Sequence, residues 1–265
     1  MIAMDSKERF SNRVENYVRY RPSYPQRVLE TLRQECGFTP DSAVADMGSG
    51  TGILTRLFLE NGNTVYGVEP NARMREAGEE YLRAFPRFRS INGTAESTTL
   101  PSGSVDFVVA GQAFHWFDAQ RARAEFARVF KPDGWVAIVW NNREKDASPF
   151  LRDYESLLRT YGTDYEQVAQ KYPENDPLDK FFGEGASKGR SFANRQEFDF
   201  DGLRGRLLSS SYAPPEGHLN HEAMLEKLHR IFEQHARDGR VVLEYTTKLY
   251  FGRLHASVER SAQTR

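Results

Sequence analysis

Hydrophobic and polar positions along the chain fall into blocks that predict an α/β protein. Apolar runs with strand character occupy residues 43–46, 64–69, 88–92, 105–110 and 135–140. Between them, residues 53–59 and 121–130 carry apolar side chains at helical spacing. Strands that alternate with helices favour βαβ units, and hence an open parallel sheet covered by helices. The run 135–140 is apolar throughout, so we expect that strand to be buried on both faces.

The pattern changes after residue 140. Residues 142–146 are charged, and the segment that follows has helical character at 149–161 and 165–171 but no strong strand. Later segments predict a closing strand, a helix with one apolar stripe and a last strand at 191–198, 221–236 and 241–251. The chain therefore returns to the sheet after a mainly helical, polar insertion.

A turn rich in glycine separates the first strand from its helix. Gly48, Gly50 and Gly52 stand at alternate positions directly after Asp46 and Met47. Glycine can take positive φ and lets a ligand approach the backbone, and the free amides of the following helix point into the same space. A tight turn with close helix packing is the plainer interpretation. The spacing differs from the G-x-G-x-x-G of dinucleotide-binding proteins, and Asp46 would repel a phosphate but attract a cationic ligand.

The stretch Asp46–Gly52 resembles motif I of the class I S-adenosylmethionine-dependent methyltransferases. Residues 100–106 resemble the loop that enters the fourth strand of that family. Residues 112–117, Gln-Ala-Phe-His-Trp-Phe, are similar to a segment of the aconitate-methyltransferase-like relatives in the methyltransferase type 11 group. Nucleobase and glutamine N-methyltransferases have Asn/Asp-Pro-Pro-Tyr/Phe here instead. The resemblance extends from about Val44 to Trp140.

The resemblance implies a Rossmann-like, doubly wound, seven-stranded and mostly parallel sheet, with an antiparallel last strand and a helical cap insertion. Four parts of the chain are expected on this basis. They are an N-terminal helical segment that covers the cofactor, the S-adenosylmethionine-binding core, the cap, and the completion of the sheet, at residues 1–40, 41–140, 141–188 and 189–265.

Composition limits the partners. Among 265 residues, 36 Lys and Arg nearly balance 37 Asp and Glu, so the net charge of −1 offers no field for nucleic acid or an anionic membrane. The single cysteine, Cys36, argues for a reducing compartment. We find no signal sequence at the N-terminus and no apolar run long enough to span a membrane. We expect a cytoplasmic protein with a small-molecule substrate; its oligomeric state is open.

The second predicted strand ends in an acid, Glu69, at close to the spacing of about 20 residues expected of a ribose-binding carboxylate. Its alternative role is to cap the next helix. In relatives an apolar residue equivalent to Met74 packs on the adenosine, and an acidic pair at Ala95-Glu96 borders the adenine. Ala95 replaces the usual Asp, so its backbone or Glu96 would have to serve. The resemblance implies a cofactor site made of Tyr17, Arg21, Asp46, Gly48, Ser49, Gly50, Gly52, Glu69, Pro70, Met74, Ala95, Glu96 and Gln112.

The N-terminal segment has helical spacing that is broken at Tyr20-Arg21-Pro22-Ser23-Tyr24-Pro25. By resemblance, this segment folds over the cofactor, with Tyr17, Tyr20 and Arg21 near the methionine end or the substrate. Arg21 can pair with a carboxylate of either. The plainer interpretation is a helix pair that packs on the sheet with its tyrosines at the rim.

His115 is the candidate catalytic residue, because it follows the fourth strand and an imidazole can accept a proton from a hydroxyl nucleophile. It can equally be a histidine fixed under the loop, since a carboxylate acceptor needs no base. We assign Tyr20, Trp116 and Arg143 to the substrate; Arg143 can alternatively be a solvated loop residue. No metal site is expected, because the later histidines lack ligand spacing.

These features predict methyl transfer from S-adenosylmethionine, with S-adenosylhomocysteine as product, to an oxygen of a small molecule, as a carboxylate or hydroxyl. Three alternatives stay open. The acceptor atom can be carbon or nitrogen, the chain can bind the nucleoside without catalysis, or it can be a nicotinamide-dependent oxidoreductase. The glycine spacing and Asp46 argue against the last of these.

Overall fold

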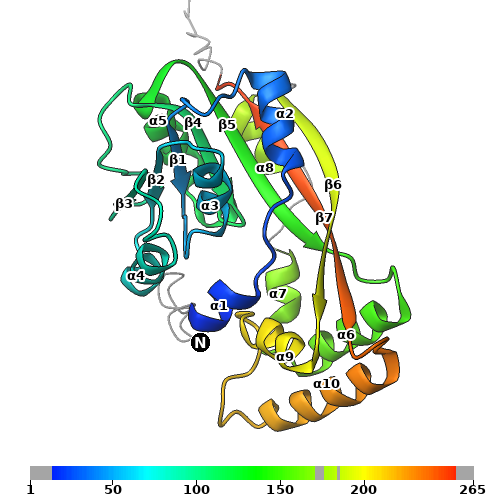
Figure 1. The fold of residues 1–265 in the computed structure, drawn as a ribbon. Helices are drawn as coiled ribbons and strands as arrows, with labels where there is room; N and C mark the ends of the chain where they lie inside the picture. The colour runs from blue at the N-terminus through cyan, green and yellow to red at the C-terminus, as the bar shows by residue number, and fades with distance from the viewer. Residues whose placement is uncertain (1–13, 171–175, 184–185, 255–265) are drawn as a thin grey trace, which may run out of the picture.

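A computed structural model describes residues 14–170, 176–183 and 186–254 of the chain. These residues form a seven-stranded sheet with the order β3-β2-β1-β4-β5-β7-β6 (Figure 1). The strands β1 to β7 are Val44–Met47, Val65–Val68, Phe88–Ile91, Val105–Gly111, Phe130–Arg143, Ser187–Phe198 and Val241–Gly252.

Strands β1 to β5 are parallel to one another, and β7 runs antiparallel to both β5 and β6. The predicted fold is confirmed: the sheet is mostly parallel, and its last strand in sequence is antiparallel. Because β1, β2 and β4 are parallel, their carboxyl ends meet at one edge, where Gly48, Glu69 and Gln112 follow the strands.

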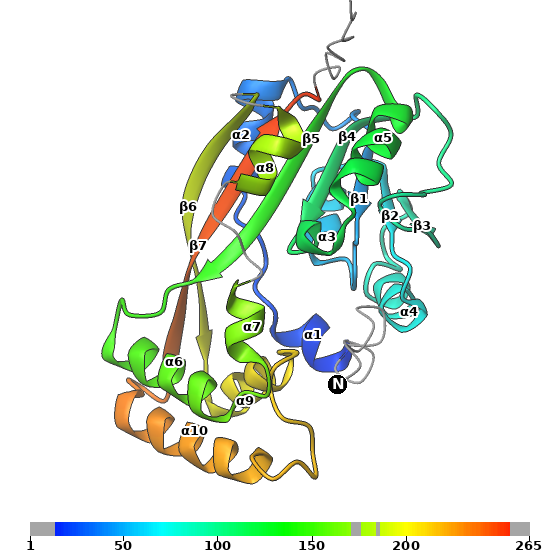
Figure 2. The same ribbon diagram turned by 180° about the vertical axis from the view of Figure 1, so that it is seen from behind.

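Helices cover both faces of the parallel part of the sheet (Figures 1 and 2). On one face, α2 and α3 bury Leu32 and Phe58 against β1 and β5; on the other, α5 and α8 bury Phe126 and Phe181 against β4 and β5. The helices are α1 Val14–Tyr20, α2 Arg27–Cys36, α3 Ile53–Glu60, α4 Ala72–Tyr81, η2 Phe114–Trp116, α5 Ala119–Val129, α6 Pro149–Tyr161, α7 Tyr165–Gln170, α8 Asp176–Phe182, α9 Phe200–Leu208 and α10 His221–His235.

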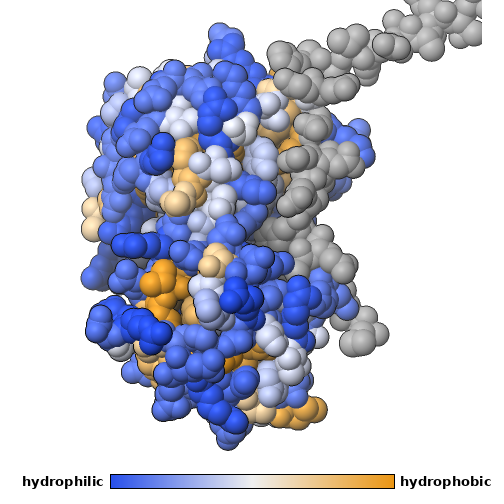
Figure 3. Space-filling model, turned by 90° about the vertical axis from the view of Figure 1, so that its right-hand side faces the viewer, coloured by the Kyte–Doolittle hydropathy of each residue, from blue (hydrophilic) through white to orange (hydrophobic). Residues whose placement is uncertain are grey.

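A second helical group surrounds the far ends of β6 and β7, which extend beyond the parallel sheet (Figures 1 and 2). Helices α6, α7, α9 and α10 share their own apolar core with these strands, built around Leu158, Leu207 and Leu243. Helix α1 lies between the two regions, since it contacts both α4 and α9. The side of the molecule in Figure 3 is mostly hydrophilic, with small hydrophobic groups. No helix in the described ranges is long and apolar enough to cross a membrane.

Strand β5 is longer than its apolar run predicts. It begins at Phe130 and includes the predicted turn 131–134 as an irregularity, because its register against β4 shifts between the pairs Val105–Phe130 and Phe107–Trp135. Asp133 has a positive φ of 68° there. At the other end β5 continues past Trp140 to Arg143, since β7 pairs with it to that point. The predicted N-terminal helix before residue 14 and Lys171 at the end of a predicted helix lie outside the described residues.

Candidate functional site

The glycine turn after β1 has a backbone that other residues would not tolerate. Gly48, Gly50 and Gly52 all have positive φ, at 67°, 57° and 86°. A Cβ on Gly48 would lie 2.8 Å from the Ala113 side chain, and one on Gly52 would lie 2.5 Å from Leu82. The alternate spacing of glycine therefore reflects both backbone conformation and close packing, and it leaves the turn without side chains.

Glu69, at the end of β2, is held in place by this turn. Its Oε2 accepts a hydrogen bond from the Gly50 amide (2.9 Å), and its Oε1 accepts one from the Asn71 amide (2.8 Å). The side chain is nearly buried, and burial raises the pKa of Glu69, although the two amides act in the opposite direction. Each carboxylate oxygen retains a lone pair for a hydroxyl donor. The carboxylate is therefore fixed in orientation and can accept two further hydrogen bonds.

Asp46 is the second acid at this edge, and it is 1% exposed. Its Oδ2 accepts a 2.6 Å hydrogen bond from the hydroxyl of Thr55, whereas its Oδ1 is buried and has no hydrogen-bond partner within the described residues. Burial raises the pKa of Asp46 to about 7, against the effect of the Thr55 hydroxyl and helped by the Glu69 charge. A buried acceptor without a partner is unfavourable unless a ligand donates to it.

Three cavities meet at the carboxyl edge, with volumes of about 50, 180 and 870 Å³. The smallest lies over the glycine turn and Asp46; the second runs from Gly50 past Glu69 to Ala95 and Glu96; the largest is a cleft between β5, β7 and the helical group. Gln112 lines all three. Gln112 therefore lies where the two acid-lined cavities and the open cleft come together.

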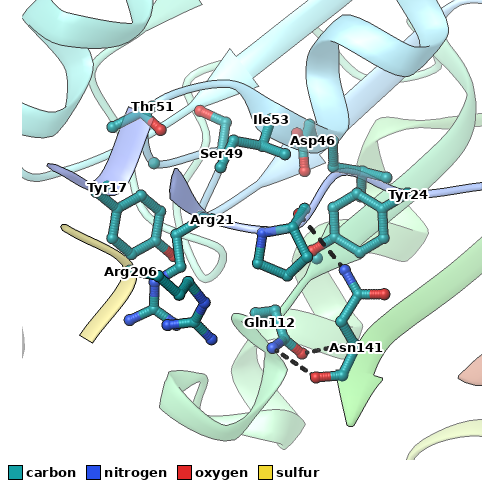
Figure 4. A pocket seen from close by; sticks show the side chains of 15 residues that line it. Tyr17, Arg21, Tyr24, Asp46, Ser49, Thr51, Ile53, Gln112, Asn141 and Arg206 are labelled. Atoms are coloured by element: carbon teal, nitrogen blue, oxygen red, sulfur yellow. Dashed lines mark hydrogen bonds between the residues drawn. The ribbon is translucent and has the colours of Figure 1, made fainter. Parts of the chain in front are cut away.

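Gln112 is held in an unusual conformation. Its φ is +56°, which is uncommon for a residue with a side chain. The side-chain amide pairs with the backbone of Asn141 on β5: Gln112 Oε1 accepts from Asn141 N (3.1 Å), and Gln112 Nε2 donates to Asn141 O (3.3 Å; Figure 4). Strained backbone of this kind clusters at functional sites, where the surrounding structure determines it.

The second cavity contains most of the residues expected near an adenosine. Met74, Glu69 and Ala95 line it together with Trp116, which is 36% exposed. Glu96 lines it too, and its Oε1 accepts a hydrogen bond from the Asp118 amide (2.9 Å). The walls are thus apolar, with carboxylates at two places.

Fourteen of the seventeen residues predicted from sequence line at least one of the three cavities, and three do not. Those that line at least one cavity are Tyr17, Arg21, Asp46, Gly48, Ser49, Gly50, Glu69, Pro70, Met74, Ala95, Glu96, Gln112, Trp116 and Arg143. Gly52, Tyr20 and His115 line none of the three. Tyr20 packs against α9 at Gly205, and the His115 ring lies 4.8 Å from that of Trp116 on η2. Their predicted roles stay predictions.

Arg143 reaches the large cleft but is already paired. Its Nη2 lies 2.6 Å from Glu155 Oε2 on α6 and 3.1 Å from the Tyr165 hydroxyl, and both charged side chains are only 10% exposed. Its guanidinium also stacks over Tyr154, 5.2 Å from the ring centroid. Arg143 is therefore neither a solvated loop residue nor a cation without a partner.

Several lining residues were not found from sequence, and two of them are polar residues beside Gln112 in the smallest cavity. Asn141 lies at the end of β5, and Arg206 lies on α9, which the sequence pattern does not single out. Arg206 had one recognisable signal: it stands among Leu203 and Leu207 on the apolar side of a helix, where a charged residue is unusual. No group of three or more potential metal ligands occurs in the described part of the chain.

Comparisons with known proteins agree with this geometry. Residues 45–138 match a family model described as a methyltransferase domain, of type 11. An uncharacterised methyltransferase of Mycobacterium tuberculosis is 40% identical over 172 residues, which cover 64% of this chain and 65% of that protein. An uncharacterised methyltransferase of Geobacillus thermodenitrificans is 31% identical over 159 residues, 58% of this chain and 67% of that protein. The chain thus spans a little under two thirds of the mycobacterial relative.

Among solved structures, a type II methyltransferase from Anaeromyxobacter dehalogenans superposes with a TM-score of 0.62 at 22% identity. The match covers 89% of this chain and 98% of that one. At this level of identity the likeness establishes the fold.

Proposed function

The chain belongs to the type 11 group of S-adenosylmethionine-dependent methyltransferases, and we propose that it transfers a methyl group to an oxygen atom of a small molecule. The observation that carries the proposal is the junction at Gln112. There, two small cavities, one lined by Asp46 and the other by Glu69, share a lining residue with a cleft of about 870 Å³. A cofactor on one side and an acceptor on the other would meet at this side chain.

The residues present fit the cofactor of the family. Asp46 Oδ1 is a buried acceptor without a hydrogen-bond partner among the described residues, which suits an ammonium donor. Glu69 is fixed by two amides and has acceptor capacity left for two ribose hydroxyls. Met74, Ala95 and Glu96 would border the base, and the bare backbone at Gly48 and Gly50 would admit the methionine part.

S-adenosylmethionine, when bound, supplies a methyl group on a sulfonium that leaves as a neutral thioether. The chain then has to hold the acceptor in line with that group and keep water out. Tyr17 and Arg21 line the pocket from the N-terminal segment, and α1 contacts both α4 and α9. We assign the segment up to residue 40 to covering the cofactor; among its described residues, the position of 17–24 beside the smallest cavity supports this, whereas α2 packs on a face of the sheet.

The lining of the cleft supports an oxygen acceptor. No histidine lines any of the three described cavities, so an acceptor that is already deprotonated fits better than one that must lose a proton. Carboxylates and phenolates meet this condition. Methylation of carbon or nitrogen, and binding of the nucleoside without catalysis, are the alternatives that the experiment below separates.

The experiment is a methyltransferase assay with labelled S-adenosylmethionine and a panel of small carboxylic acids, hydroxylated aromatics and amines. We expect label in an ester or ether product, and loss of that product in Glu69→Ala. Glu76→Ala is the matched control, because Glu76 is exposed on α4, close to Glu69 in sequence. Label in amines or at carbon would contradict the oxygen acceptor. Tight binding of the nucleoside without turnover of any acceptor would favour the binding module.

A further inference from the structure

Arg206 is a buried cation without a counter-ion in the described part of the chain. Its side chain is 5% exposed near the end of α9. Nε donates to the Tyr245 hydroxyl (3.2 Å), and Nη1 donates to the hydroxyls of Ser210 (3.1 Å) and Ser209 (3.4 Å). It forms no ion pair with any described residue. All its protein partners are neutral hydroxyl groups, and its side chain lines both the smallest cavity and the large cleft.

A second guanidinium converges on the same place from the N-terminal segment. Arg21 Nη2 donates to the Ser209 carbonyl (2.9 Å), so both arginines contact Ser209. Arg21 Nε is buried and has no hydrogen-bond partner in the described ranges, and the guanidinium stacks on the Tyr17 ring at 4.7 Å. Arg21 lines the same two cavities as Arg206. Two fixed positive charges therefore face the junction at Gln112.

The contrast with Arg143 shows that this arrangement is unusual within the molecule. Arg143 is similarly enclosed, yet Glu155 neutralises it at 2.6 Å. Taking a guanidinium out of water costs free energy that a paired acid offsets, and a neutral hydroxyl offsets much less of it. Arg206 carries that cost, and the half-buried Arg21 a part of it, without an acid among the residues that the structure describes. An anionic ligand would supply the missing partner.

The neighbouring phenol responds to the same positive charge. Tyr212 lines the cleft, and burial acts to raise the pKa of its phenol. That pKa is nevertheless lowered on balance, chiefly because the Arg206 guanidinium favours the phenolate; Arg143 and Arg21 act in the same direction. The local potential thus favours a negative charge within the cleft.

We propose that Arg206 and Arg21 form an anion-binding subsite for the methyl acceptor, and that the acceptor is a small molecule bearing a carboxylate. The inference rests on the methyl transfer proposed above and names its substrate class. A planar guanidinium matches the two oxygens of a carboxylate. The C-terminal end of α9 carries the negative end of the helix dipole. It repels a doubly charged phosphate more strongly than a singly charged carboxylate. Arg206, rather than the already paired Arg143, is the anchor.

The test measures binding to the wild-type protein saturated with S-adenosylhomocysteine. Acetate, succinate and benzoate are each titrated against their amides by calorimetry and thermal shift, with inorganic phosphate as a further arm. We expect at least one carboxylate to bind and raise the melting temperature, at least tenfold more tightly than its amide. If no carboxylate of the panel binds better than its amide, or if phosphate alone binds, the inference is overturned.

Variants then assign the subsite. Arg206→Met should weaken the carboxylate at least tenfold, with affinity for S-adenosylhomocysteine within about twofold of wild type. The carboxylate affinity of Arg206→Lys should lie between those of wild type and Arg206→Met, since lysine keeps the positive charge but lacks the planar guanidinium. Arg204→Gln is the matched control, because Arg204 lies exposed on the same helix; it should change neither affinity.

A purely structural arginine would give a different result. The hydroxyls of Tyr245 and Ser209 have other acceptors, Gln196 (3.0 Å) and the Arg206 carbonyl (2.7 Å). We therefore expect ligand-free Arg206→Met to melt within a few degrees of wild type. A much lower melting temperature, with normal carboxylate binding in Arg206→Lys, would make Arg206 a structural residue and overturn the assignment. Absence of S-adenosylhomocysteine binding to wild type would instead defeat the proposed function.

Discussion

The two ends of the pocket differ in charge and in how the chain builds them. The glycine-turn end carries Asp46 and Glu69, two nearly buried acids whose pKa values are both raised by burial. The cleft end carries Arg21 and Arg206, two guanidinium groups that also line the Asp46 cavity and form no ion pair within the described structure. A cationic nucleoside suits the first end and an anionic acceptor the second, so the pocket is polarised along the line from one ligand to the other.

The ends also differ in sequence separation. Asp46, the glycines and Glu69 belong to one β1-α3-β2 unit, so short local contacts fix the acid end. The cleft end joins Arg21, the end of β5 and α9, and its contacts bridge the N-terminal segment and the C-terminal third. The first end can therefore be recognised as a motif. The second exists only once the sheet and the helical group are assembled.

The substitution with the largest expected effect is at Glu69, in the glycine-turn (acid) end of the pocket. In Glu69→Ala, the charged acceptor for two ribose hydroxyls is lost, and hydrogen bonds to charged groups contribute about 1.5–3 kcal/mol each. We expect affinity for S-adenosylhomocysteine to fall by at least about 100-fold, as measured by calorimetry. Affinity in Glu76→Ala should stay at the wild-type value. A Glu69→Ala protein that folds and binds the nucleoside normally would remove Glu69 from the site.

The next largest effect is expected from a substitution in the cleft, away from the proposed nucleoside site. Glu155→Gln leaves Arg143 charged and nearly buried without its acid, and breaking a buried pair costs about 3–5 kcal/mol. We expect the free energy of unfolding to fall by about 3 kcal/mol in urea. Glu60→Gln, which removes an exposed pair with Arg56, should cost under about 1 kcal/mol. Equal losses in the two variants would contradict the contrast between the buried and exposed pairs.

The sequence predicts the glycine-turn end of the pocket well and the cleft end poorly. The alternation of strands and helices and the position of Glu69 after the second strand follow from local periodicity, and the structure has them. The antiparallel last strand was implied by the family resemblance, and the structure has it too. Arg206 was missed because its meaning depends on Ser209 and Tyr245 folding around it and on Arg21 arriving from the other end of the chain. Arg143 looked like a loop residue because β7 extends β5 beyond its apolar run, which only the paired register reveals.

A smaller effect is expected in the pH dependence of stability and binding, through Asp46. Burial raises the pKa of Asp46 to about 7, whereas an aspartate in the unfolded chain titrates near 4. The folded, ligand-free protein therefore holds this proton more tightly, so the contribution of Asp46 to stability falls as pH rises from about 4 to 7.

An ammonium ligand favours the carboxylate form of Asp46. We therefore expect affinity for S-adenosylhomocysteine to rise up to about tenfold between pH 6 and 8 in wild type. In Asp46→Asn, both the stability and the affinity for S-adenosylhomocysteine should depend less on pH. An identical pH profile in Asp46→Asn would show that another group is responsible.

The smallest effect concerns the histidine at the edge. The His115 ring lies against Trp116 and lines none of the three cavities. We therefore expect His115→Gln to change kcat by less than about threefold, well below the 10²–10⁴-fold contribution of a general base. The measurement is kcat against pH on an acceptor found in the panel assay. A loss of 100-fold, with the acidic limb removed from the profile, would restore His115 as the base.

The most direct test of the polarised pocket is a crystal structure of the protein with S-adenosylhomocysteine and the carboxylate that binds best. The account predicts the nucleoside over the glycine turn, with its ribose on Glu69, its ammonium on Asp46, and the carboxylate between Arg206 and Arg21 beside Gln112. A nucleoside bound elsewhere, or a carboxylate on Arg143 with Arg206 still without an anion, would contradict it.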